Sequence, residues 1–195
     1  MNIGIASALA VLLSLLPTAA LAQTSDEPAT AAAETRRVQH PQSGTDLPIP
    51  AGWYLREEHK ADGYAVFVSK EEIVTGGRFL TGFSLNWFAE VRARKGVTPS
   101  GYAAAFIDQI IQTRPGARRE QAEIAPGVVV HEARYNHDSD GPPTMLLYFA
   151  IGDDRNDTLR LAWYEAPEST WDADWASGEA VVLEFLRSAA RAASN

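Results

Sequence analysis

The stretch MLLYFAI, residues 145–151, decides the fold because every one of its positions is apolar. Alternate side chains of a strand point to opposite faces of a sheet, so a strand that is apolar on both faces needs cover on both sides. Val128-Val129-Val130 has the same character. The two stretches together predict a central sheet with a layer of structure packed against each face.

Short turn sequences separate the strands predicted around this stretch. The apolar runs place them at roughly 118–124, 127–137, 144–152 and 157–165. Pro126-Gly127 divides the first pair, an Asp- and Gly-rich turn at 138–142 the next, and residues 153–156 the last. Connections this short imply antiparallel hairpins.

The N-terminal half predicts further strands by the same criteria, although two prolines exclude a central strand at residues 47–53. A turn at Pro41–Gly44 follows the first of them, and a charged loop covers residues 70–78. The predicted strands are 38–40, 53–59, 64–69 and 79–88.

Two amphipathic helices complete the pattern. Thr98 is a good N-cap, Pro99 fits the first helical position, and Pro115-Gly116 ends this helix. The second helix is expected to begin at Ser169 or Thr170, where Ser169 and Asp172 resemble a capping box. Its apolar stripe comprises Trp171, Trp175, Val182, Phe185, Leu186 and Ala189, with Gly178 among them. The predicted class is α+β, an antiparallel β-sheet flanked by two main helices in an α/β/α sandwich.

The N-terminus indicates export from the cell. Residues 1–22 carry no charged side chain, and Ala20-Leu21-Ala22 is the small-x-small pattern that a signal peptidase accepts. The apolar run is shorter than the roughly 20 residues that span a bilayer. We therefore expect a cleaved signal peptide at 1–22, a disordered tether at 23–35 and one globular domain at 36–191, in the bacterial periplasm or the medium. After cleavage, no membrane-spanning segment is expected.

Composition limits the partners and the chemistry. The formal net charge of −8 argues against a nucleic-acid or anionic-lipid partner. The absence of cysteine excludes disulfides, thiolate metal sites and lipid attachment to a cysteine. Two basic groups flank the first helix, but its length separates them by roughly 20 Å, so we expect solvated turns rather than one patch. These groups are Arg92, Arg94 and Lys95, then Arg114, Arg118 and Arg119.

The search for catalytic, cofactor-binding and metal-ligating motifs predicts none, and therefore no cofactor. His131-Glu132 begins like a zinc motif, but Tyr135 stands where the second histidine is required. Residues 136–141 match half of an EF-hand loop, yet Leu147 replaces its bidentate glutamate, so an acidic turn is the simpler interpretation. His131 and His137 are about 20 Å apart along one strand, too far to share a metal. We expect these two histidines to be partly exposed in a sheet; His40 and His59 lie in other segments, and the sequence does not place them.

On one face of the strand predicted at 79–88, three successive positions carry small or polar residues, namely Gly82, Ser84 and Asn86. Two roles stay open for it. Either a helix packs closely there, or the face forms the floor of a ligand groove with Trp87 and Trp163 as walls.

The order of the elements resembles the PsbP-like superfamily. The resemblance rests on the Pro-x-Pro-x-Gly-Trp segment (Pro48, Pro50, Gly52, Trp53), a hairpin, an aromatic strand ending near Trp87, a helix, antiparallel strands and a C-terminal helix. It covers about residues 36–190. It implies an exported α/β/α sandwich with a non-enzymatic role in assisting an assembly or binding a ligand. The family has no universal catalytic residues to transfer.

Three functions stay open. The first is a non-catalytic accessory or interaction protein of the bacterial cell envelope, with an envelope protein as its partner. The second is a periplasmic module that binds a small ligand in a cleft. The third is an exported hydrolase, which requires a pKa-shifted acid or histidine lining a cleft.

The signal peptide generates the first testable prediction. The protein isolated from the periplasm of a bacterium that produces the full chain is expected to begin at Gln23, measured by intact mass and N-terminal sequencing. Replacing Ala20 and Ala22 by bulky residues should retain the leader, since the peptidase requires small side chains there. Recovery of the uncleaved chain from the wild type would contradict the prediction.

Overall fold

The computed structural model describes residues 36–40, 45–60, 63–74, 77–137 and 141–194. The predicted signal peptide, the tether, the turn at 41–44 and the tip of the acidic turn at 138–140 lie outside these residues. Export, cleavage and the limits of the domain therefore stay predictions.

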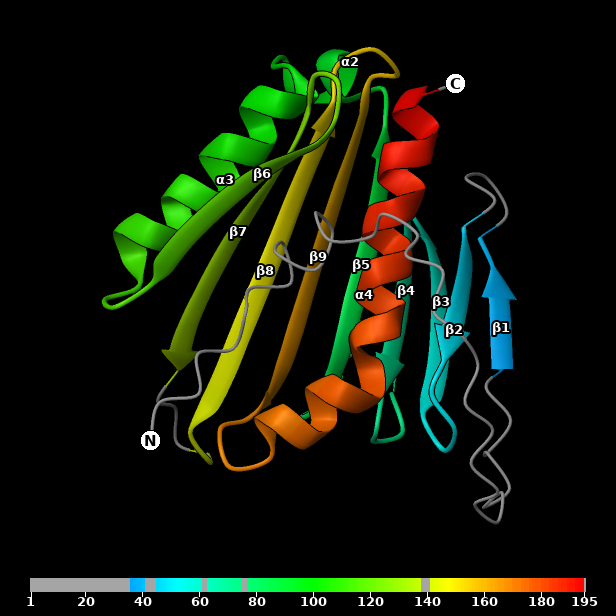
Figure 1. Ribbon diagram of the computed structural model, residues 1–195, viewed down its shortest axis with the longest axis vertical. Helices are drawn as coiled ribbons and strands as arrows, with labels where there is room; N and C mark the ends of the chain where they lie inside the picture. The colour runs from blue at the N-terminus through cyan, green and yellow to red at the C-terminus, as the bar shows by residue number, and fades with distance from the viewer. Residues whose placement is uncertain (1–35, 41–44, 61–62, 75–76, 138–140, 195) are drawn as a thin grey trace, which may run out of the picture.

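Within the described residues, a seven-stranded antiparallel sheet has the order β3-β4-β5-β9-β8-β7-β6, and β1 and β2 form a separate two-stranded sheet (Figure 1). Every neighbouring pair in the large sheet is antiparallel, as the short turns predict. The strands are β1 (Arg36–Gln39), β2 (Asp46–Ile49), β3 (Tyr54–Lys60), β4 (Gly63–Ser69), β5 (Gly82–Ala89), β6 (Arg118–Ala125), β7 (Val128–His137), β8 (Thr144–Asp153) and β9 (Thr158–Pro167).

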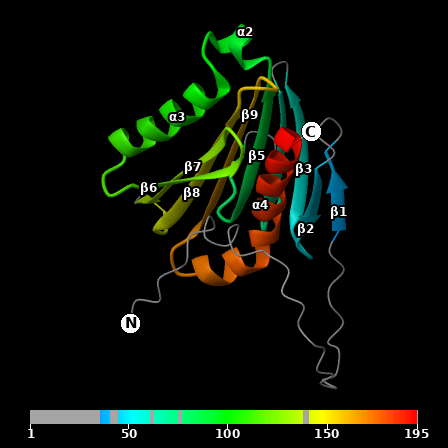
Figure 2. The same cartoon turned by 45° about the horizontal axis from the view of Figure 1, so that its top comes forward.

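The two predicted helices are α3 (Pro99–Thr113) and α4 (Trp171–Ser194), and they lie on opposite faces of the sheet (Figures 1 and 2). We call these faces the α3 face and the α4 face. The hydroxyl of Thr98 accepts a hydrogen bond from the N–H of Gly101 at 3.1 Å, which confirms the predicted N-cap. The α/β/α sandwich predicted from the sequence is confirmed.

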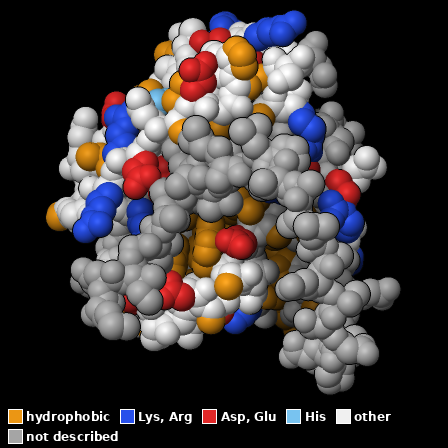
Figure 3. Space-filling view, viewed as in Figure 1, with side chains coloured by type: hydrophobic (Ala, Val, Ile, Leu, Met, Phe, Trp, Pro, Cys, Tyr) orange, Lys and Arg blue, Asp and Glu red, His pale blue; other side chains and the backbone are white. Residues whose placement is uncertain are grey.

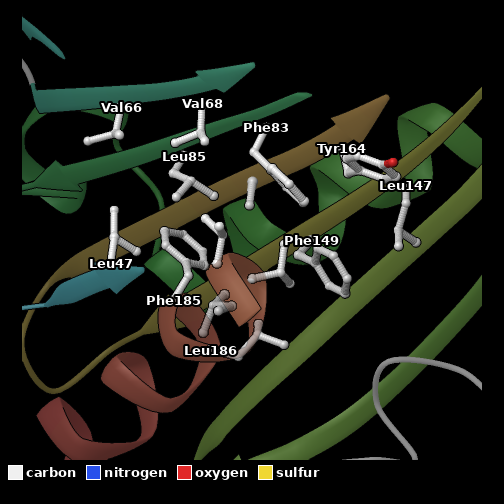
Figure 4. Close-up of a cluster of buried hydrophobic side chains, with 14 of the residues drawn as sticks. Leu47, Val66, Val68, Phe83, Leu85, Leu147, Phe149, Tyr164, Phe185 and Leu186 are labelled. Atoms are coloured by element: carbon white, nitrogen blue, oxygen red, sulfur yellow. The ribbon is translucent and has the colours of Figure 1, made fainter. Parts of the chain in front are cut away.

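The main core lies between α4 and the sheet (Figure 4). Leu147 and Phe149 of β8 face Phe185 and Leu186 of α4, and all of them are buried. The β1–β2 hairpin closes one side of this core, because Leu47 and Ile49 pack into it. Burial of side chains this large contributes roughly 1.5–3 kcal/mol each.

A smaller core fixes α3 on the other face. Ala103 and Ile107 of the helix are fully buried against Ala133 and Ala150 of the sheet. α3 packs over β8, β7 and β9. The small-residue face of β5 is therefore not the seat of this helix, which excludes one of the two roles predicted for it.

Several boundaries differ from the sequence-based prediction. Residues 79–81 precede β5 instead of opening it, and α4 begins at Trp171, immediately after Thr170. The basic residues predicted to lie in a solvated turn form a short helix, α2 (Val91–Lys95). Its N-cap, Glu90, has a φ of 56°, and the buried side chain of Val91 fixes the helix on the domain.

Gly152 controls how closely α3 approaches the sheet. A Cβ atom at this position would lie 2.2 Å from the backbone nitrogen of Ser100 and 2.3 Å from the carbonyl carbon of Pro99. Both contacts are with helix backbone, which cannot rotate away.

Gly152→Ala is therefore expected to lower the free energy of unfolding by about 1–3 kcal/mol, as overpacking does in other cores. Urea denaturation of the mature protein measures this change. Gln112→Ala, at an exposed position of the same helix, is the control and should leave stability nearly unchanged. Equal urea midpoints for the two variants would contradict the prediction and show that α3 can move away from the sheet without loss of stability.

Candidate ligand-binding groove

One end of the α3 face is hollowed into a groove of about 430 Å³. Arg114, at the C-terminal end of α3, lines one side, and the loop between β4 and β5 lines the other. Strands β3, β4, β7, β8 and β9 supply side chains to the floor. The volume falls within the range of small-molecule sites in proteins.

Three aromatic rings form a continuous row across the floor. Tyr135 and Tyr148 stack with centroids 6.0 Å apart and planes inclined by 4°, and Tyr148 lies 6.1 Å from Trp163. Tyr148 and Trp163 are direct cross-strand partners, so the register of β8 on β9 sets this contact. Phe106 of α3 packs on Tyr148 at 6.1 Å and closes the row on the helix side.

A small residue separates this row from the next aromatic side chain. Ser84 of β5 stands opposite Trp163 on one side and Phe67 on the other. Neighbouring strands are about 4.8 Å apart, so Trp163 and Phe67 rise from backbones roughly 10 Å apart with little side-chain volume between them. The Ser84 hydroxyl is buried and accepts a hydrogen bond from Asn86 at 3.0 Å.

The groove predicted over the small-residue face lies elsewhere, because Gly82, Ser84 and Asn86 are buried and do not line it. Trp163 lines it, as predicted. Trp87 does not, because it follows Asn86 in the strand and points to the α4 face, where it stacks on His40 at 4.4 Å. The prediction for Trp87 was wrong, since it ignored the alternation of side chains along β5.

A single carboxylate organises the loop that forms the second wall. Glu71 accepts hydrogen bonds from the backbone N–H groups of Leu80 and Thr81 at 3.2 and 3.1 Å. Phe79 is thereby buried, and Arg78 lines the groove. Two apolar side chains of this loop stay open to solvent, Val74, which lines the groove, and Leu80, which does not.

Glu165 has an unusual environment in the floor. It lies on β9 between Leu146 of β8 and Gly82 of β5. Burial raises the pKa of its carboxyl from 4.5 to about 7, with Arg78 opposing the shift and Glu71 adding to it. In the described part of the chain no side chain or backbone group forms a hydrogen bond with the carboxyl of Glu165. Its carboxyl therefore presents both a donor and an acceptor to whatever fills the groove.

Three arginines face the same space. Arg56 is paired with Glu58 at 2.8 Å, and the guanidinium of Arg114 lies 5.5 Å from the centroid of the Tyr135 ring. Arg78 lies on the loop wall. Within the described residues, neither Arg78 nor Arg114 forms an ion pair. Burial raises the pKa of the Tyr148 phenol above its ordinary value.

The histidines lie in different places from one another, and the prediction of partial exposure is wrong for His131, which is buried, while His137 is partly exposed. His40 is buried beside Trp87, and burial, together with the charge of Arg160, lowers its pKa to about 4. His131 is buried beneath α3, where Arg119 lies 3.2 Å from Nδ1. His137 lines the end of the groove, and His59 is exposed.

Other predicted features stay apart from the groove. Asp174, in the first turn of α4, is buried and forms an ion pair with Lys70. No cluster of three potential ligands suited to a metal ion occurs among the described residues. None of the helices that they form has the length and apolar character needed to cross a membrane. Acidic and basic side chains are interspersed over the described surface in Figure 3.

A second, smaller hollow of about 180 Å³ lies farther along the same face. Leu161, two residues before Trp163 on β9, lines it together with Tyr102 of α3. Arg94 and Lys95 of α2 stand at this hollow, and Arg94 is paired with Glu90 at 2.9 Å.

The comparisons with known proteins do not assign a family. No family model matches the chain, and no curated protein matches it. Among solved structures, LpqN, described as involved in cell envelope biogenesis of Mycobacterium tuberculosis, is 12% identical with a TM-score of 0.44, covering 76% of this chain and 87% of its own. PA94 from Pseudomonas aeruginosa, a protein of unknown function, is 14% identical with a TM-score of 0.37, covering 78% and 93%. At these values neither likeness bears on function, and the PsbP-like resemblance stays a prediction.

The raised pKa of Glu165 has a measurable consequence. Between the ordinary pKa near 4.5 and the folded-state value near 7, the folded chain holds a proton that the unfolded chain has lost. Stability contributed by this group is therefore complete below about pH 4.5 and is lost as the pH rises through 7.

Between pH 5 and pH 8 the wild type should lose roughly 1–3 kcal/mol more stability than Glu165→Gln, since one pKa unit corresponds to about 1.4 kcal/mol. Urea denaturation across this range measures the difference. Glu120→Gln, at an exposed position on β6, should follow the wild type. Parallel pH profiles for wild type and Glu165→Gln would show that the carboxyl is solvated.

Proposed function

We propose that this protein is an exported, non-catalytic binding protein that holds a small organic ligand in the groove on the α3 face. The observation that carries the proposal is the row of Tyr135, Tyr148 and Trp163 beside the Glu165 carboxyl, for which the described residues supply no hydrogen-bond partner. Ligand sites combine a mostly apolar lining with a few polar groups that converge on the ligand. The predicted leader supports export to the periplasm.

An envelope accessory protein with a protein partner stays the alternative. The exposed apolar side chains of the loop between β4 and β5, Val74 and Leu80, favour a contact of this kind. The two functions are compatible, because a ligand bound in the groove would touch the same loop. A ligand site, however, also accounts for the half-buried acid in the floor, which a flat protein contact leaves unexplained.

An exported hydrolase has one observation in its favour. Glu165 is the pKa-shifted acid in a cleft that such an enzyme requires. Acid–base catalysis also needs a nucleophile or an activated water within hydrogen-bond reach of the acid. Among the described residues, no hydroxyl or imidazole forms a hydrogen bond with this carboxyl. The groove therefore favours binding over hydrolysis.

A neutral hydrophobic probe tests the binding function. Phenylnaphthylamine is expected to gain fluorescence when it enters the groove of the mature protein, because the aromatic floor excludes water from it. Trp163→Ala should weaken this binding about tenfold or more, as the loss of an aromatic contact of 1–3 kcal/mol implies. Fluorescence titration measures the affinity.

Val97→Ala removes an exposed apolar side chain outside the groove and should bind the probe like the wild type. Phe67→Ala, on another strand of the floor, gives an independent second variant if Trp163→Ala unfolds. Circular dichroism checks the fold of each variant. Unchanged affinity in both folded groove variants would overturn the proposed function.

A further inference from the structure

We propose that the ligand of this groove is a small aromatic acid, a flat ring that carries a carboxylate, sulfonate or phosphate group. The inference rests on the proposed function and narrows it to one chemical class. Its basis is the combination of an aromatic floor with two arginines, Arg78 and Arg114, that enter the groove from its two walls.

The floor fits a planar apolar body. The rings of Tyr148 and Trp163 are inclined by 30° and belong to a cross-strand pair that the sheet holds in place. Both side chains are half-buried, so part of their surface is open to the groove. A flat ring placed on them gains offset stacking in addition to buried area.

The walls fit an anionic substituent. Arginine binds carboxylate and phosphate oxygens through paired hydrogen bonds and is the preferred residue for this purpose. Arg56 already has a carboxylate partner in Glu58, whereas Arg78 and Arg114 form no ion pair within the described residues. Stacking on Tyr135 restricts Arg114 and so lowers the entropic cost of binding an anion.

The position of these arginines on an acidic protein strengthens the assignment. The chain as a whole carries a formal charge of −8, which repels anions from most of its surface. Three arginines and two glutamates line the groove, so its charge is opposite in sign to that of the chain. A cationic ligand would find more favourable sites elsewhere.

Protonation in the groove adds a pH dependence to this binding. An anion beside Glu165 is repelled when that carboxyl is ionised and can accept its proton in a hydrogen bond when it is neutral. Affinity for an anionic ring compound should therefore fall as the pH rises from 6 to 8. Glu71 also acts on Glu165. The charged and titratable groups that line the groove around it are Arg56, Glu58, Arg78, Arg114 and His137.

Two fluorescent probes separate the acid class from simple apolar binding. Anilinonaphthalene sulfonate carries the ring system of phenylnaphthylamine plus one negative charge. The mature wild-type protein is expected to bind the sulfonate about tenfold more tightly at pH 6 and low salt. Arg78→Gln with Arg114→Gln should weaken binding of the sulfonate about tenfold more than binding of the neutral probe, and so abolish the preference. Added salt should weaken binding of the sulfonate probe only, since salt screens interactions between charges.

Lys95→Gln is the matched control, because it removes a cation from the second hollow on the same face. It should keep the preference for the sulfonate, and loss of the preference in this variant would overturn the assignment to the groove. Equal affinities of the wild type for the two probes, both lost in Trp163→Ala, would overturn the acid class and leave the proposed function standing. Insensitivity of both probes to Trp163→Ala and Phe67→Ala would overturn both.

Discussion

The two-sided burial of β8 is the constraint on which the other layers depend. Its Leu147 and Phe149 belong to the α4 core, while Ala150 and Gly152 face α3. Side-chain size on the α3 face increases along the strand, from Gly152 and Ala150 to Tyr148. The helix therefore touches the sheet backbone at Gly152, whereas farther along it packs on the ring of Tyr148 through Phe106. Beyond the tight contact at Gly152, the larger side chains hold α3 away from the sheet, and the groove with the aromatic floor lies at this end.

Sequence patterns predict the elements that depend on local signals. Thr98 caps α3, Pro99 opens it, and the apolar stretch at 145–151 forms the central strand. Local patterns do not predict the helix α2. It begins after Glu90, whose backbone is in the left-handed conformation, and it is held by the burial of one side chain, Val91. Local patterns also do not predict that α3 packs over β7 to β9, since contacts between distant segments decide this position.

The groove was predictable only in part, for reasons that lie in strand register. Period-two alternation places Ser84 and Trp163 on the α3 face, and the same rule places Trp87 on the other, where it helps to bury His40. The row formed by Tyr135, Tyr148 and Trp163 needs the registers of three strands, which no local pattern supplies. Glu165 gave no sequence signal, because its raised pKa arises from burial in the folded domain.

Glu165 differs from the buried charged residues Arg160 and Asp174, because each of those has a partner within the domain. Arg160, buried on the α4 face, donates a hydrogen bond to Ser188 at 2.6 Å and lies near the carboxylate of Asp153. Asp174 is matched by Lys70. Glu165 has no such partner among the described residues, and its raised pKa reflects a cost to stability at neutral pH. Where other charges are matched internally, an unmatched carboxyl beside open aromatic rings favours an external partner that supplies the missing hydrogen bonds.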